Sequence, residues 1–235
     1  MILLRSILWM IAFYLWSVII GLAMIPLLLA PRRWMIAAMA FWARGVNAMI
    51  EPICGIAVEF RGLENLPKGR SLIAAKHQCM YDTMGPFAVL PDFSYVMKKE
   101  LMLIPFYGWY SAKAGMIVVD REAHAKALRK LVADAKDRMK EERQIVIFPE
   151  GHRHDPGADP DYKPGVAALY RELDVPCVPV ATNSGVHWPA HGIRRIPGRI
   201  VYEFLEPIPP GLHRKEFMKL LEERTETASR RLLSE

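Results

Sequence analysis

The first fifty residues form two long apolar stretches that are separated by a short basic segment. The first stretch, Ser6–Ala30, has 25 residues and no charged side chain. At about 1.5 Å per residue, a helix of this length is long enough to cross a bilayer core of roughly 30 Å. Pro26 is expected to bend or end that helix. The second stretch, residues 34–50, contains Arg44 and Asn47. It predicts a helix that lies either in the membrane interface against the first helix or in the core of the following domain.

After residue 50 the pattern changes to short apolar runs that alternate with amphipathic stretches. The short runs predict strands at Ile56–Phe60, Ser71–Ala75, Ser94–Met97, Met116–Val119, Ile145–Phe148, Val178–Thr182 and Ile200–Phe204. Helices are expected at Thr83–Leu90 with Asp82 as the N-cap, at Arg121–Arg143 and at His213–Leu233. Strands that alternate with helices are typical of α/β proteins. We therefore expect an α/β domain over residues 51–235, with a mixed, largely parallel sheet flanked by helices, behind a membrane-anchoring region over residues 1–50.

Charge is distributed unevenly along the chain. Of the net charge of +6, residues 1–50 carry +4, because they contain four arginines and no acidic residue. The remaining +2 does not favour nucleic-acid binding, whereas a basic, apolar N-terminus suits an anionic membrane surface. Arg32 and Arg33 favour a cytoplasmic location for the domain behind them. Three cysteines are too few for a disulfide framework.

Candidate chemistry begins with the segment KHQCMYD, residues 76–82. His77 and Asp82 are five positions apart, so their side chains can face each other at a turn between a strand and a helix. A carboxylate placed there keeps one imidazole nitrogen protonated and leaves the other free to act as a base. The same pair also fits a strand-end histidine and a capping aspartate with no catalytic role. Cys79 offers a nucleophilic thiol, although a small buried cysteine is the simpler interpretation.

Three further segments lie at the ends of predicted strands. Arg121 ends GMIVVDR, where an arginine either binds a phosphate as a bidentate fork or forms a surface ion pair. In IVIFPEGHRH, Gly151 permits close approach of the backbone to a ligand, and Glu150 either bonds a substrate hydroxyl or is solvated. The segment VPCVPVATNSG has Pro179 within a predicted strand, which indicates an edge strand or an irregular end beside a pocket.

These segments are more informative together than apart. The order H-x4-D, G-x-I-x-x-D-R, F-P-E-G-x-R and V-P-V-A, behind an apolar N-terminus, resembles the four motifs of the glycerophosphate acyltransferase superfamily. The resemblance extends from about Val58 to the C-terminus, includes KKEL, IPFYGW and YKPGVAAL, and is closest to bacterial lysophosphatidic acid acyltransferases. It implies an enzyme that moves a fatty acyl chain from a thioester donor to the sn-2 hydroxyl of 1-acyl-sn-glycerol 3-phosphate. The product of that transfer is phosphatidic acid.

The resemblance also implies roles for individual residues. His77 is similar to the family's general base, and Asp82 to the residue that orients the base. The implied acceptor site comprises Arg121, Glu150, Gly151 and Arg153, with Lys98 and Lys163 as additional phosphate contacts. The motif near the acyl donor falls on Val178, Pro179 and Val180. The implied donor is acyl-CoA or acyl carrier protein, which are both anionic and suit basic patches. Attack on a thioester needs neither a metal nor a cofactor.

One position departs from the family pattern. The third motif carries His152 where the family usually has threonine or serine. The sequence therefore allows two kinds of acceptor, lysophosphatidic acid or another lyso-lipid such as a lyso-ornithine lipid. A non-catalytic, membrane-anchored lipid-binding protein is the alternative of a different class. His152, His154, Asp155 and Asp159 also have metal-ligand chemistry, but their segment HRHDPGADPD is expected to be a solvated loop.

Overall fold

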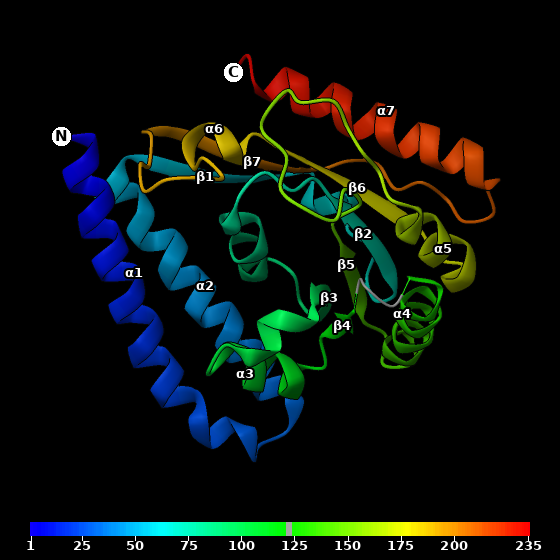
Figure 1. Ribbon diagram of the computed structural model, residues 1–235, viewed down its shortest axis with the longest axis horizontal. Coiled ribbons are helices and arrows are strands. Elements are labelled where there is room, and N and C mark those ends of the chain that lie inside the picture. The colour runs from blue at the N-terminus through cyan, green and yellow to red at the C-terminus, as the bar shows by residue number, and fades with distance from the viewer. Residues whose placement is uncertain (121–123) are drawn as a thin grey trace.

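The computed structural model describes residues 1–120 and 124–235, and it places a sheet between two layers of helices (Figure 1). Within these residues, seven strands form one sheet in the order β1-β7-β6-β2-β5-β3-β4. The strands are β1 (Ile56–Arg61), β2 (Ser71–Ala75), β3 (Phe93–Lys98), β4 (Ile117–Val119), β5 (Gln144–Ile147), β6 (Cys177–Thr182) and β7 (Gly198–Phe204). The strands from β6 to β4 in this order run parallel, whereas β7 pairs antiparallel with β6 and parallel with β1. The expected α/β fold with a mixed, largely parallel sheet is confirmed.

Helices cover both faces of this sheet. They are α1 (Ile2–Met24), α2 (Arg32–Cys54), α3 (Tyr107–Ala114), α4 (His124–Met139), α5 (Pro164–Leu173), α6 (Ser184–His187) and α7 (Arg214–Leu232). α2 and α3 pack on one face of the sheet, and α4, α5 and α7 cover the other face. Alternate residues of β2 serve the two faces, since Ile73 joins the core with α2, and Leu72 and Ala74 join the core with α4 and α5.

α1 is the apolar helix that the sequence predicts near the N-terminus. It ends at Met24, and a 3-10 turn over Ile25–Leu28 contains Pro26, as expected from the proline. With this turn, the segment Ile2–Leu28 is the one part of the described chain that is long and apolar enough to cross a membrane. Only 17% of its most apolar window is buried. This apolar exposed helix suggests that the protein associates with a membrane.

α2 lies antiparallel to α1 and belongs to the core of the domain (Figure 1). Its buried face, which includes Met39 and Val46, packs in the same core as the sheet. The helix over residues 34–50 is therefore a core helix, one of the two alternatives that its sequence left open. Gly45 lets Trp16 of α1 lie against α2, because a Cβ at Gly45 would be 2.3 Å from the Trp16 ring.

The segment after His77 is where the expected local structure is wrong. Residues Thr83–Leu90 do not form a helix, and two 3-10 turns, Met80–Thr83 and Gly85–Ala88, occur instead. Pro86 explains the break, because a proline removes a backbone donor and prevents a continuous helix through this point. Asp82 consequently lies inside the first turn and is not the N-cap of a following helix.

β6 is an interior strand between β2 and β7, so the edge position suggested by Pro179 is wrong. The backbone oxygen of Val180 accepts a bond from Lys76 at the end of β2, and that of Pro179 accepts one from Leu205. The backbone nitrogen and oxygen of Pro179 thus point toward β7, at the level where β7 ends at Phe204. A proline is tolerated there because its missing N–H falls at the end of the ladder.

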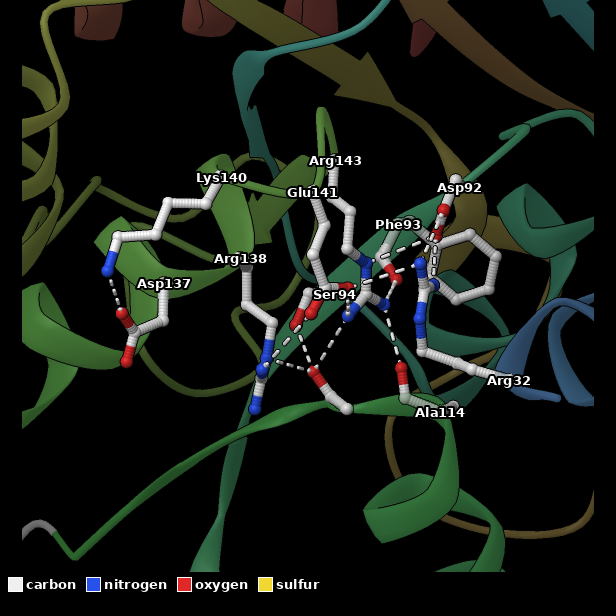
Figure 2. Close-up of polar contacts among 11 residues, drawn as sticks. Arg32, Asp92, Phe93, Ser94, Ala114, Asp137, Arg138, Lys140, Glu141 and Arg143 are labelled. Atoms are coloured by element: carbon white, nitrogen blue, oxygen red, sulfur yellow. Dashed lines mark hydrogen bonds and ion pairs between the residues drawn. The ribbon is translucent and has the colours of Figure 1, made fainter. Parts of the chain in front are cut away.

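Arg143 ties several ends of elements together at the edge of the sheet where β3 and β5 begin (Figure 2). Its guanidinium group is fully buried and donates to Asp92 Oδ1 at 3.1 Å. It also donates to three backbone carbonyls, those of Phe93, Ala114 and Gly115. Arg32, the first residue of α2, binds Asp92 in a bidentate manner at 2.7 and 3.0 Å. The cluster therefore fixes α2 and α3 relative to the sheet.

Candidate active site

Several of the predicted site residues lie at the opposite edge of the sheet. β2, β3, β4, β5 and β6 are parallel, so the segments that follow them emerge at one edge. His77 follows β2, Gly151 and Arg153 follow β5, Lys98 ends β3, and Ser184 follows β6. In open α/β sheets, ligands bind at the carboxyl ends of the strands. The fold therefore supports a site at this edge.

A tight turn brings His77 and Asp82 together. Cys79 is extended, and the 3-10 turn Met80–Thr83 then carries Asp82 back toward the end of β2. His77 Nδ1 lies 3.1 Å from Asp82 Oδ2. When Nδ1–H donates to the carboxylate, the lone pair of Nε2 is left available as a base. The ring of His77 stacks on Phe148 at 4.2 Å between centroids, and its side chain is 14% exposed.

Asp82 is almost completely buried and is held by several donors. Its Oδ2 also accepts the backbone N–H groups of Gln78 at 2.7 Å and Cys79 at 2.8 Å. Its Oδ1 accepts the hydroxyls of Ser184 at 2.5 Å and Tyr202 at 2.8 Å. Burial acts to raise the pKa of Asp82, but the bonds from His77, Cys79 and Ser184 outweigh it, so the pKa lies below its ordinary value. The group stays ionised at neutral pH and is suited to orient an imidazole.

A second buried charge cluster lies next to His77. Lys76 Nζ is 2% exposed and contacts Glu150 Oε1 at 3.0 Å and Glu226 Oε1 at 2.7 Å. Tyr162 donates its hydroxyl to Glu226 at 3.1 Å. Glu150 is 1% exposed, so the structure does not place its carboxylate where a substrate hydroxyl has access. Pairing with the buried lysine explains this position, because an unpaired buried ammonium group is costly.

The described residues among the rest of the predicted acceptor site lie on the surface near this edge. Gly151 has a φ of +73°, which glycine adopts without strain, and Arg153 is exposed and donates to the carbonyl of Ala190 at 3.2 Å. Lys98 and Lys163 are also exposed, and Lys163 pairs with Asp161. Arg121 lies outside the described residues.

The three residues predicted near the acyl donor are buried inside the sheet. Val178, Pro179 and Val180 belong to β6, and each faces a residue of β2 in the parallel register. Their side chains contribute to the walls and core beneath the site, and Val180 lines a small cavity together with Asp82 and Tyr202.

The two alternatives for other chemistry have little support. Cys79 is fully buried, and burial raises the pKa of its thiol well above the ordinary value. A reactive thiolate is therefore not favoured at this position. In the described part of the chain, no three His, Cys, Asp or Glu side chains are grouped as metal ligands. The rings of His152 and His154 lie 4.3 Å apart in the polar loop after β5.

Comparison with known proteins identifies the family. The family model called Acyltransferase matches residues 57–183, which is more than half of the chain. The chain belongs to the acyltransferase family. The matched segment begins in β1 and ends just after β6, so it contains both His77 and Asp82.

Several curated relatives of this acyltransferase are named as acting on lysophosphatidic acid. It is 34% identical over 159 residues to the 1-acyl-sn-glycerol-3-phosphate acyltransferase of Pseudomonas aeruginosa, covering 68% of this chain and 62% of the relative. It is 29% identical to the alpha form from Mus musculus, covering 66% of this chain and 55% of the relative. The matched part of the chain thus spans less than two thirds of the length of these relatives.

A solved structure supports the fold of the whole acyltransferase. The crystal structure of the 1-acyl-sn-glycerophosphate (LPA) acyltransferase from Thermotoga maritima superposes with a TM-score of 0.84. The superposition covers 100% of this chain and 99% of that protein, at 22% sequence identity. The likeness therefore includes the two N-terminal helices and the C-terminal helix as well as the sheet.

Three contacts of the site were not anticipated from the sequence. Ser184 and Tyr202 hold Asp82 from 102 and 120 positions away, and Glu226 reaches Lys76 from 150 positions away. The TNSG segment directly after the V-P-V-A motif was a signal for Ser184, because it follows a predicted strand into the same edge. Tyr202 and Glu226 lie in an ordinary strand and an ordinary amphipathic helix, and their local sequences carry no such signal.

Proposed function

We propose that this acyltransferase transfers a fatty acyl chain from a thioester donor to the sn-2 hydroxyl of 1-acyl-sn-glycerol 3-phosphate and forms phosphatidic acid. The observation that carries the proposal is the contact between His77 Nδ1 and the buried Asp82 carboxylate, within the segment that the Acyltransferase family model matches. The names of the matched relatives support this acceptor. The donor is acyl-CoA or acyl carrier protein.

In the proposed reaction, His77 is the general base. Nε2 takes the proton of the acceptor hydroxyl as its oxygen attacks the thioester carbonyl carbon. The carbon–sulfur bond then breaks, and the departing thiolate receives the proton from the imidazolium group. Asp82 stabilises the imidazolium between these steps and keeps its orientation. No acyl-enzyme is formed, and positioning of the two substrates supplies a large part of the rate.

We propose that basic residues bind the phosphate of the acceptor at the edge of the sheet that carries His77. Arg153 is exposed beside Gly151, so its guanidinium group is accessible to a phosphate. Arg121 is the second proposed phosphate ligand, and Lys98 and Lys163 are additional contacts. Arginine suits this task because its planar fork binds phosphate with two parallel hydrogen bonds. Glu150 contributes from beneath the site, through its bond to Lys76.

We further propose that residues 1–50 anchor the enzyme to the inner membrane, with residues 51–235 facing the cytoplasm. The outer side of α1 supports anchoring, since most of its exposed residues are large and aliphatic, including Leu4, Leu8, Ile11, Leu15, Val18 and Leu22. The start of α1 also lies close to the site. Trp9 contacts Trp188 at 4.7 Å between ring centroids, and Trp188 stacks on Tyr81, the neighbour of Asp82.

The test is acyl transfer by detergent-purified protein and its His77→Ala variant. Labelled acyl-CoA is supplied with lysophosphatidic acid, lyso-ornithine lipid or glycerol 3-phosphate, and acyl carrier protein is the donor in a parallel series. Phosphatidic acid formed by the wild type and not by His77→Ala supports the proposal. If only a different acceptor gives product, the assigned substrate changes and the proposed mechanism stays. No product with either donor favours a lipid-binding protein that lacks the chemistry.

His152 favours one alternative within this function, an acceptor with another head group. It is exposed in the loop after β5, where the family usually has a hydroxyl residue. We expect His152→Thr to retain activity on lysophosphatidic acid, because the substitution restores the usual polar contact of the acceptor site. Initial rates with the three acceptors measure this. A collapse of activity on lysophosphatidic acid would show that the imidazole has a role of its own.

A further inference from the structure

α7 reaches the active site from the face of the sheet opposite to His77. Successive residues of a strand point to opposite faces. Leu72 and Ala74 of β2 point toward the layer of α4, α5 and α7, and Lys76 continues this series. Lys76 accordingly meets Glu226 of α7, which crosses this layer in red in Figure 1. Glu226 is buried and accepts bonds from Lys76 and Tyr162, and Lys76 is the partner that joins it to His77 in the chain.

The side chain and the backbone of Lys76 are both fixed. Its N–H donates to the carbonyl of Val180 at 2.9 Å, which extends the ladder between β2 and β6. Its Nζ is held between Glu226 at 2.7 Å and Glu150 at 3.0 Å. The next residue in the chain is His77, whose carbonyl accepts the N–H of His154 at 2.9 Å. The base is therefore attached to a residue that has little freedom to move.

Packing alone does not explain why Lys76, Glu150 and Glu226 are charged residues. Lys76, Glu150 and Glu226 are at most 8% exposed, and burying three charged groups carries a large desolvation penalty. Apolar side chains of similar volume would fill the same space without it. One lysine also faces two carboxylates, and Glu150 Oε2 has no hydrogen-bond partner among the described residues. A directional requirement at Lys76 explains these charges, because ion pairs with hydrogen bonds fix a side chain in one orientation.

α7 supports the Asp82 side of the pair as well. The carbonyl of Leu232, the last residue of α7, accepts a bond from Asn183 Nδ2 at 3.3 Å. Asn183 Oδ1 accepts the N–H of Val201 at 2.9 Å. The residue after Asn183 is Ser184, whose hydroxyl binds Asp82 Oδ1 at 2.5 Å. One helix thus contacts the supports of both His77 and Asp82.

We propose that Glu226 is a positioning residue for acyl transfer, which holds Lys76 and through it the backbone of His77 in the reactive arrangement. The inference rests on the proposed function. It gives α7 a catalytic support role, although this helix lies outside the segment 57–183 that defines the family match. Small displacements of a base are costly for catalysis, since a misplacement of about 1 Å lowers rates by on the order of 10²-fold.

The test compares Glu226→Gln with Glu223→Gln, a matched change on the exposed face of the same helix. We expect Glu226→Gln to lower kcat by about 10- to 100-fold with KM within twofold of the wild type. Glu226→Asp, which retains the charge, should recover part of this loss, and Glu223→Gln should equal the wild type. The second readout is the low-field proton resonance of His77 Nδ1–H, identified by its absence in His77→Ala. It should shift or broaden in Glu226→Gln and stay unchanged in Glu223→Gln.

A normal kcat and a normal His77 resonance in folded Glu226→Gln would overturn the proposal, as would a loss of thermal stability alone. If Glu226→Gln does not fold, Tyr162→Phe replaces it, because this change removes only the hydroxyl that binds Glu226. It should lower kcat in the same direction by a smaller factor, and an unchanged kcat would contradict the proposal. If the wild type is inactive with every acceptor, the proposed function fails, and the resonance still tests the positioning role.

Discussion

The buried carboxylate of Asp82 determines what His77 can do. Six donors surround the two oxygens of Asp82, including the Cys79 thiol at 3.7 Å, and two of them are backbone N–H groups fixed by the turn. Charge-assisted bonds of this kind are short and directional. Since they lower the pKa of Asp82 despite its burial, the carboxylate remains an acceptor for His77 at neutral pH. The imidazole therefore keeps the tautomer in which Nδ1 carries the proton and Nε2 is unprotonated, as the proposed base requires.

Asp82→Asn tests this role at nearly constant size. The amide presents only one acceptor oxygen, and its NH2 group donates where the native carboxylate accepts, so it no longer selects the same tautomer of His77. We expect kcat to fall by about 10²- to 10⁴-fold with little change in KM. Steady-state acyl transfer by purified protein measures both constants. Ser184→Ala is the control, because it removes one bond and keeps the charge, and its loss of kcat should be much smaller. An Asp82→Asn variant with wild-type kcat would rule out an orienting role.

At the scale of the elements, the sequence patterns identify strands better than their arrangement. Apolar runs located all seven strands of the described sheet, because a buried strand must be apolar along its length. The reversed direction of β7 and the interior position of β6 depend on contacts between distant strands. α3 and α5 were not assigned as helices, since their short segments show no extended helical pattern and depend on packing against the sheet.

The same limit applies to the candidate site. His77 and Asp82 were recognisable because five residues of local sequence bring them together, and Gly151 and Arg153 share one short segment. Glu150 was read as an acceptor ligand from that segment, but its buried environment is set by Lys76 and by Glu226 on the C-terminal helix. Residues that complete a site from far along the chain follow from the tertiary structure alone.

Arg143 connects the start of β3 with the end of α3, and its replacement tests how much this connection stabilises the fold. In Arg143→Met, the carbonyls of Phe93, Ala114 and Gly115 lose a buried donor (Figure 2). We expect the free energy of unfolding to fall by about 3 kcal/mol, because the buried carbonyls of Phe93 and Ala114 each lose a guanidinium donor. The Gly115 carbonyl keeps its bonds from Ser94 and Arg138, and Asp92 keeps its bonds from Arg32. Lys140→Met removes a fully exposed pair with Asp137 in the same region and should have no measurable effect. Chemical denaturation in one detergent compares the variants. An Arg143→Met variant as stable as the wild type would show that Arg143 does not stabilise the fold.

At the scale of the whole molecule, α1 is fixed to the domain along its entire length. Near its start, Ser6 Oγ accepts the N–H of Arg195 at 2.8 Å, and Trp9 is 1% exposed. Near its end, the carbonyl of Gly21 accepts the hydroxyl of Tyr110 in α3. A helix that crossed the bilayer would either lose these contacts or carry α2 and the sheet into the hydrocarbon. Both outcomes are costly, since the sheet edge and its loops are polar.

These contacts predict that α1 enters one leaflet from the side of the catalytic domain and does not cross the membrane. The three cysteines of the chain are buried, so a cysteine in a short polar tag before Met1 and a second one at the exposed Leu63 (Leu63→Cys) provide selective reporters. A membrane-impermeant maleimide is applied to intact cells and to inverted membrane vesicles. We expect both reporters to react in inverted vesicles and neither in intact cells, because the proposed orientation places the N-terminus and the domain on the cytoplasmic side. Labelling in detergent controls for reactivity. An N-terminal reporter that reacts only in intact cells, with Leu63→Cys reacting only in vesicles, would establish a full span and would require α1 to separate from the domain.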